Sequence, residues 1–215
     1  GTPFTLAGTP QEWLHRFAEY FYPLPTDAAL GRRRARAAAL LEFALPGPAY
    51  IYQGEELGLP EVEDLPDEVR DDPSFFRTNG RIVGRDGCRV PLPWSGTKPP
   101  YGFGLDAEPW LPQPAAWADL SVAAQDGDPD STLSLYRHAL AIRSAHPALG
   151  DGTIAWSDDY PGHVLYFTRE PGFGCLVNLS AEPVPLPGGT QVLVASGPLE
   201  DGLVPTDTAV WLDLP

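Results

Sequence analysis

The chain has 215 residues, a formal net charge of −15 at pH 7 and 43% hydrophobic residues. This length allows one large domain or two small ones, and the apolar content predicts a packed core and excludes global disorder. The acidic balance argues against nucleic acid and against an anionic membrane surface as partners, because such binders present a positive face.

Cysteine usage and hydropathy exclude further classes. Cys88 and Cys175 have neither the spacing of a metal site nor that of a disulfide framework, which fits a reduced, cytoplasmic setting. We expect no metal and no cofactor. The sequence contains no run of about 18 apolar residues, so no membrane span is expected, and no signal peptide is visible. The chain begins GTPF and contains no methionine, so we expect a fragment, an excerpt or a trimmed product.

Two helices are predicted in the first 45 residues of the chain. Residues 1–25 are ambiguous, although Gln11–Tyr22 spaces its aromatic residues like a short amphipathic helix. A second helix is predicted over Asp27–Leu45, with Thr26 or Asp27 as its cap and Pro46-Gly47-Pro48 as its end. Its basic run, Arg32–Arg36, is interpreted as a solvated helix face rather than a nucleic-acid patch. The residues expected on its apolar side are Leu30, Ala37, Ala38, Leu41 and Leu45.

A short apolar run follows this helix and ends in carboxylates. Ala49–Gln53 alternates small and aromatic residues and predicts a buried strand, which with the helix forms an α–β unit. Gly54 is expected to let the backbone turn sharply. Neighbours on an extended segment point in opposite directions, so Glu55 and Glu56 are poor candidates for an acid/nucleophile pair.

Residues 55–117 show little periodicity. A loop of this length in a compact domain is usually functional. Its acidic run, Glu61–Asp72, is interpreted as solvated surface, because it lacks the alternating ligand pattern of a calcium loop.

The last third of the chain changes character. Asp130–His146 predicts a helix with Asp130 or Ser131 as its cap and an apolar side of Leu133, Leu135, Tyr136, Leu140 and Ile142. Short runs between Gly, Pro and Asp turns then predict a small antiparallel β module. We therefore expect two domains, 1–149 and 150–215, with a boundary near 148–152.

Two motifs in this order resemble a known family. The segments "RRRARAAALL…ALPGPAYIYQGEELGLPEV" and "GRDGCRVPLPW" resemble the C-terminal portion of α-glucosidases and oligo-1,6-glucosidases of the α-amylase group, glycoside hydrolase family 13. The resemblance covers about residues 27–215. It implies an α/β plus all-β fold: a partial (β/α)8 barrel followed by a small antiparallel β-sandwich. Asp27–Leu45, Ala49–Gln53 and Asp130–His146 would be the seventh helix, eighth strand and eighth helix of the barrel.

The resemblance also implies two substrate-binding residues. The first arginine of "RDGCR", Arg85, would reach the sugar in the cleavage subsite, since a guanidinium suits hydroxyls and a carboxylate together. Glu56 would lie near the sugar bound just after the cleavage point. The alternatives are that Arg85 only fixes the loop through a salt bridge and that Glu56 only caps a loop. Arg89 is expected to be loop scaffolding.

No catalytic residue is assigned. Retaining hydrolysis needs a nucleophile and an acid/base carboxylate, which in this family follow the fourth and fifth strands, and we expect both outside this chain. The family's Asn-His-Asp motif is missing; His15-Arg16 is its nearest echo. The predicted function is a part of an α-glucosidase that acts on terminal α-D-glucosyl residues of oligosaccharides and is inactive alone.

The alternative function is a non-catalytic module that binds sugar weakly or packs against a partner chain. Trp94, Trp110 and Trp117 would then stack on sugar rings, or else pin the long loop. A partial barrel exposes sheet edges, which predicts association through them. A transport-associated relative is the third interpretation; it needs a membrane anchor, and none is recognised.

Overall fold

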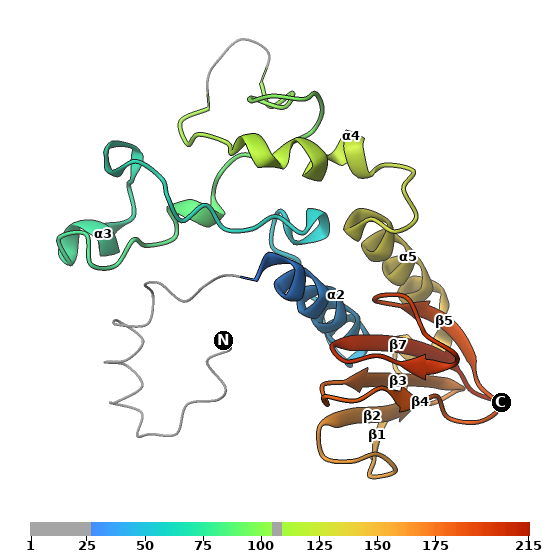
Figure 1. Ribbon diagram of the computed structural model, residues 1–215. Coiled ribbons are helices and arrows are strands. Elements are labelled where there is room, and N and C mark those ends of the chain that lie inside the picture. The colour runs from blue at the N-terminus through green and yellow to red at the C-terminus, as the bar shows by residue number, and fades with distance from the viewer. Residues whose placement is uncertain (1–26, 105–108) are drawn as a thin grey trace. The chain divides into compact units, whose positions relative to one another are not determined.

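The computed structural model describes residues 27–104 and 109–215, which form two compact units (Figure 1). The loop unit contains residues 60–104 and 109–118, and the helix–sheet unit contains residues 28–59 and 119–215. The helix predicted over Gln11–Tyr22 lies outside the described residues. The domain boundary at 149/150 stays a prediction.

The helix–sheet unit holds both of the long helices predicted from the sequence. They are α2 (Ala28–Ala44) and α5 (Thr132–Ala145), and Ser131 caps α5 by accepting a hydrogen bond from the Ser134 N–H. The short helices are η2 (Glu55–Leu57), α4 (Val122–Gln125) and η6 (Pro147–Leu149), and η5 (Ala115–Leu120) begins in the loop unit. No helix among the described residues is long and apolar enough to cross a membrane.

The predicted β module is present. Its strands are β1 (Ile154–Ser157), β2 (Val164–Arg169), β3 (Phe173–Asn178), β4 (Val184–Pro185), β5 (Gln191–Ala195), β6 (Leu203–Val204) and β7 (Thr208–Asp213). Five of them form an antiparallel sheet in the order β1-β2-β3-β7-β5, and β4 pairs with β6.

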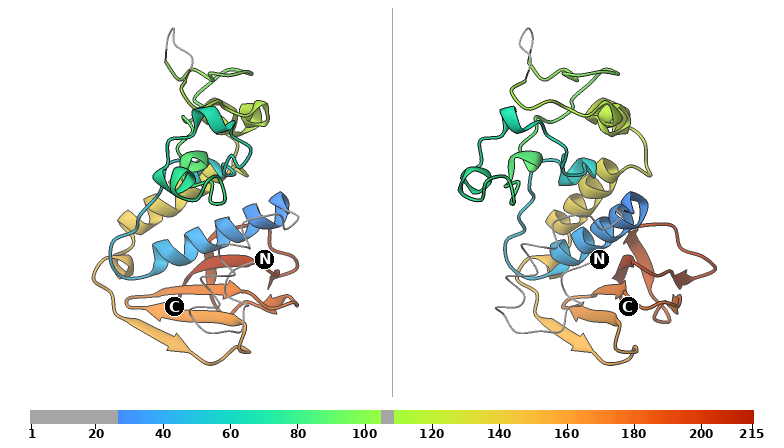
Figure 2. Two further views of the ribbon diagram at one scale, coloured as in Figure 1. Left: turned by 90° about the vertical axis from the view of Figure 1, so that its left-hand side faces the viewer. Right: turned by 60° about the vertical axis from the view of Figure 1, so that its left-hand side comes forward.

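Both faces of this sheet are covered. Cys175 and Val177 on β3 point to the core shared with α2 and α5, whereas Leu176 between them points to the core under β4 and β6. This alternation follows from the two-residue period of a strand. Figure 2 shows α2 lying along one face of the sheet. Within that core the indole N–H of Trp211 donates to the Leu40 carbonyl at 2.9 Å.

The apolar side of α2 was predicted only in part. Ala37 is buried, and Leu41 and Leu45 are half-buried against the core, as expected. Ala38 is instead exposed, and the other buried positions are Ala39, Leu40, Phe43 and Ala44. The helix is rich in alanine, so its own pattern selects a face weakly and contact with the sheet decides which side is buried.

The carboxyl end of α2 is held by two arginines. The guanidinium of Arg169 on β2, only 1% exposed, donates to the Ala44 carbonyl at 3.1 Å. Arg143 on α5 donates to the carbonyls of Phe43, Leu45 and Gly47. The last carbonyls of a helix lack intrahelical partners and carry partial negative charge, so cations are favoured there.

Arg169 also binds the turn that leads into the sheet. It donates to the carbonyls of Leu149, Gly150 and Gly152 at 2.9–3.4 Å. Among the described residues no carboxylate lies within ion-pair distance of Arg169. Burial lowers the pKa of Arg169, and the neighbouring charge of Arg143 lowers it further. The carbonyl groups alone therefore offset the desolvation of this charge.

The strand predicted over Ala49–Gln53 is wrong. The segment pairs with no described strand, and Tyr50 is 79% exposed. An extended segment becomes a buried strand only where neighbouring strands satisfy its backbone groups. Instead the Tyr50 N–H donates to the carboxylate of Glu42 at 2.9 Å.

Replacing the buried arginine tests this account. Arg169→Met keeps much of the side-chain volume but leaves four carbonyls without donors, and we expect a loss of at least about 3 kcal/mol in unfolding free energy. Urea unfolding followed by circular dichroism measures it. The control is Arg137→Met, which removes an exposed ion pair with Asp126 and should cost less than about 1 kcal/mol. Equal losses in the two variants would contradict the role of Arg169.

Candidate functional site

The candidate site in the loop unit is the turn that carries Arg85. The turn is η4 (Asp86–Cys88), and Arg85 directly precedes it. A short helix, α3 (Pro73–Arg77), begins after Asp72, whose carboxylate caps it by accepting from the Ser74 N–H at 2.9 Å. Asp72 is 1% exposed, so it is not part of the solvated surface predicted for the acidic run.

One oxygen of Asp72 holds Arg85 in two places. Oδ2 accepts from the backbone N–H of Arg85 at 3.1 Å and from its Nε at 3.3 Å. The side chain of Arg85 nevertheless remains 74% exposed. Arg89 also approaches the same oxygen, at 3.6 Å. The salt bridge and loop scaffolding considered for these arginines are therefore present, and sugar contact by Arg85 stays a prediction.

The carboxylate of Asp86 organises the backbone beneath this pair. It is fully buried, and its Oδ2 accepts from the N–H groups of Asp71 and Asp72, both at 2.9 Å. Its Oδ1 accepts from Arg89 at 3.3 Å. Each of the two buried carboxylates, Asp72 and Asp86, therefore faces hydrogen-bond donors.

Two glycines of the motif "GRDG" allow the Arg85 turn to pack closely against Asp72 and Val62. A Cβ atom at Gly84, which has φ +76°, would lie 2.4 Å from Cβ of Asp72. A Cβ atom at Gly87 would lie 2.4 Å from the carbonyl oxygen of Val62. Any larger residue would push the Arg85 turn away from its anchors.

Hydrogen bonding fixes the charge of Asp72. The Ser74 N–H, together with the backbone and guanidinium N–H groups of Arg85, holds the pKa of the Asp72 carboxyl well below its usual range, against the opposing effect of burial. Donors to the charged form favour that form. Asp72 is thus ionised whenever the loop unit is folded near neutral pH.

Glu56 lies in the helix–sheet unit, in a turn rather than on an extended segment. Glu55–Leu57 form η2, so the geometry predicted for the two glutamates is wrong. Gly54 has φ 93°, which confirms the sharp turn, and its N–H donates to the Glu56 carboxylate at 2.8 Å. Burial raises the pKa of Glu55, as do the charges of Glu42 and Glu56. The loop cap is observed, and the sugar contact of Glu56 stays a prediction.

The tryptophans of the loop unit differ in exposure. Trp117 is 3% exposed and belongs to the packed interior, so it cannot stack on a sugar. Trp94 and Trp110 are 49% and 59% exposed. Exposure of this kind is not visible in sequence, because all three residues lie in segments without periodicity.

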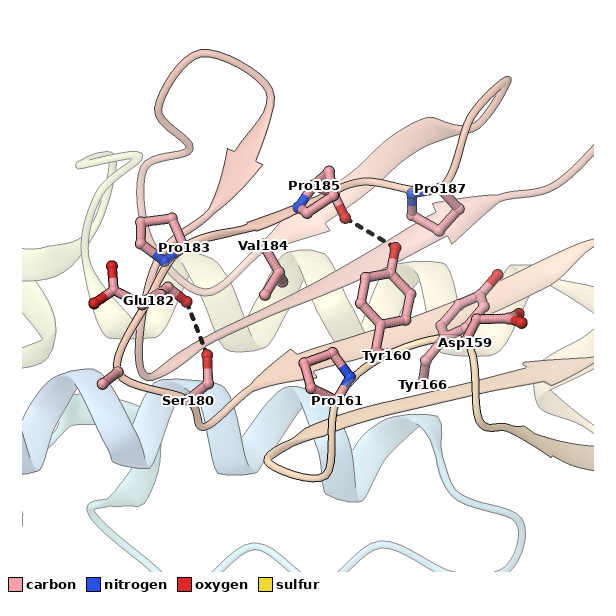
Figure 3. A pocket seen from close by; sticks show the side chains of 11 residues that line it. Asp159, Tyr160, Pro161, Tyr166, Ser180, Glu182, Pro183, Val184, Pro185 and Pro187 are labelled. Atoms are coloured by element: carbon pink, nitrogen blue, oxygen red, sulfur yellow. Dashed lines mark hydrogen bonds between the residues drawn. The ribbon is translucent and has the colours of Figure 1, made fainter.

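The helix–sheet unit also has a hollow of about 740 Å³ on the side of β4 (Figure 3). Its wall is formed mainly by prolines, Tyr160 and Tyr166. The Tyr160 hydroxyl donates to the Pro185 carbonyl at 2.8 Å, and the Ser180 hydroxyl donates to the Glu182 carbonyl, also at 2.8 Å. These hydroxyls serve the wall itself, and we assign no chemistry to the hollow. Within the described residues no cluster of acidic, histidine or cysteine side chains could hold a metal ion.

A family comparison decides the class of the chain. The model of the α-amylase catalytic domain matches residues 21–152. The chain belongs to the α-amylase family.

Relatives within the α-amylase family agree with this assignment. The chain is similar to a protein of Rhizobium meliloti (strain 1021) named "Probable alpha-glucosidase", with 42% identity over 69% of this chain and 27% of that protein. An oligo-1,6-glucosidase of Heyndrickxia coagulans is 30% identical over 63% of this chain and 27% of its own length. Among solved structures, the α-glucosyl transfer enzyme XgtA superposes with a TM-score of 0.70 at 34% identity, covering 86% of this chain and 36% of that one. The chain thus spans well under half the length of these relatives.

The charge of Asp72 should be visible as a pH effect on stability. Because its folded-state pKa is depressed, its contribution is complete above the unfolded pKa of about 3.9 and is lost as pH falls toward the folded value. We expect Asp72→Asn to lower the unfolding free energy by about 2 kcal/mol at neutral pH and by progressively less below pH ~4. Urea unfolding across this pH range measures it. The control is Asp126→Asn, at a side chain that is 62% exposed, which should show little pH-dependent difference.

The close packing of the motif gives another prediction. Gly87→Ala should destabilise the loop unit by more than about 1 kcal/mol, since the new methyl group meets a backbone carbonyl. Gly31→Ala, at an open position of α2, should instead stabilise by about 0.5–1 kcal/mol. Hydrogen exchange of the amides in each unit measures both changes. Unaltered protection around η4 in Gly87→Ala would refute the close approach.

Proposed function

We propose that this chain supplies a glucosyl-binding part of an α-glucosidase-type member of the α-amylase family. In this proposal Arg85 contacts the hydroxyl groups of a terminal α-D-glucosyl residue. The observation that carries it is the geometry of Arg85: its Nε is anchored on a buried carboxylate while most of the side chain stays exposed. Guanidinium groups held in this way present parallel N–H donors to oxygen acceptors.

The relatives support the glucosyl unit as the ligand. Their printed names include an α-glucosidase, an oligo-1,6-glucosidase and an α-glucosyl transfer enzyme. Glucosyl binding is common to the chemistry that these names describe. We propose Glu56 as a further sugar contact, with a sugar hydroxyl donating to the carboxylate oxygen that does not bind Gly54.

The proposal includes a partial (β/α)8 barrel as the setting of this chain and no catalysis by the chain alone. The carboxylates needed for retaining hydrolysis would come from residues beyond it. A non-catalytic role in weak sugar binding or in packing against a partner chain is the alternative, and the exposed segment around Tyr50 favours packing.

Sugar titration tests the proposal. Maltose and isomaltose added to millimolar concentration should shift backbone amide signals around Arg85 in nuclear magnetic resonance spectra, and Arg85→Ala should abolish these shifts. Arg77→Ala is the matched control, because Arg77 is also exposed and ends α3 in the same unit. Shifts that survive Arg85→Ala would refute the proposed contact. Release of nitrophenol from an aryl α-glucoside above the buffer rate would refute the absence of catalysis.

A further inference from the structure

We infer that Asp72 is a positioning residue that orients the Arg85 guanidinium for its ligand. The inference rests on the proposed sugar contact of Arg85. The deciding feature is that a single oxygen, Oδ2 of Asp72, accepts from both the backbone N–H and the Nε of Arg85. The other oxygen is occupied by the Ser74 N–H, so the carboxylate cannot rotate without losing a bond.

This double contact restricts a side chain that would otherwise be free. An exposed arginine samples many rotamers, and ordering it on binding costs free energy. Holding the Nε and the backbone N–H of Arg85 on one oxygen restricts the methylene groups between them to few conformations. Among the described residues, neither terminal nitrogen of Arg85 has a hydrogen bond or ion pair, so both can face a ligand.

Asp72 is itself held in place. Asp86 accepts the N–H of Asp72, and Gly84 leaves the space into which the Asp72 side chain fits. Arg89 lies 3.6 Å from Oδ2 and supplies positive charge without displacing Arg85. The position of the carboxylate is therefore determined before any ligand arrives, as preorganisation requires.

The loop has another anchor that does not involve Asp72. Arg70 is 7% exposed and donates to three backbone carbonyls, those of Glu63, Leu65 and Val83, at 2.8–3.3 Å. These bonds hold the segment 63–65 and Val83 to Arg70. Loss of the Asp72 charge should thus release the Arg85 side chain while the loop remains closed.

The test compares Asp72→Asn with Asp71→Asn and Arg85→Ala. Asp71→Asn makes the same charge change at the preceding, exposed residue. Two quantities are measured on the whole chain: hydrogen exchange of the Arg85 Nε–H group by nuclear magnetic resonance, and the affinity for maltose. We expect Asp72→Asn to accelerate the exchange and weaken maltose binding roughly tenfold. Asp71→Asn should change neither.

A conservative variant separates positioning from loss of folding. Arg85→Lys keeps the positive charge but lacks both the Nε–H and the paired terminal donors, so it should weaken binding at least as much as Asp72→Asn. If the two residues act through one contact, the double variant should be little worse than either single one. Additive losses would show that Asp72 acts on the loop in general, and would overturn the inference.

The outcomes distinguish the inference from the proposed function. If Arg85→Ala weakens maltose binding and Asp72→Asn does not, the positioning role is wrong and the sugar contact stands. If maltose binding is absent, or indifferent to Arg85→Ala, the proposed function fails. The Nε–H exchange rate then still decides whether Asp72 restrains Arg85.

Discussion

The helix–sheet unit depends on a buried cation that has no anionic partner among the described residues. Arg169 stands on β2 and donates to the last carbonyl of α2 and to the turn before β1. Its charge is offset by carbonyl dipoles, and the end of a helix concentrates such dipoles. These hydrogen bonds join the end of α2, the turn before β1 and strand β2. The hydrogen bond from the Trp211 indole N–H to the Leu40 carbonyl joins the sheet to α2 at a second point.

The loop unit also contains buried ionisable side chains, and two of these are carboxylates. Asp72 and Asp86 are buried, and each is surrounded by backbone N–H groups and arginines. A segment with almost no regular secondary structure lacks a backbone ladder, so side chains must satisfy its polar groups. The two carboxylates do this work and at the same time give Arg85 a defined position. Structural and binding roles of Arg85 are thus compatible, although they were opposed as alternatives at the level of sequence.

Membership of the α-amylase family connects these observations to carbohydrate chemistry. The matched region, residues 21–152, includes α2, the loop unit and α5. The proposed glucosyl contact draws on the family and on one geometric feature, the exposed side chain of an anchored arginine. Packing of α2 against the β module is a separate property of this chain, and it accounts for a stable core without reference to a complete barrel.

The sequence by itself determined the two long helices and the antiparallel β module, because caps, proline breaks and two-residue alternation are local signals. Two motifs in the sequence also indicated the family, by resemblance. The turn at Gly54 could also be predicted from a local signal, because a positive φ favours glycine. Only the tertiary structure decided which side of α2 is buried, that Ala49–Gln53 lacks strand partners, and that Asp72 meets Arg85. These outcomes depend on contacts between residues distant in the chain, and neither composition nor periodicity encodes them. From the sequence, the acidic run around Asp72 is interpreted as solvated surface. Only the structure shows that the turn at Arg85 packs against Asp72 and buries it.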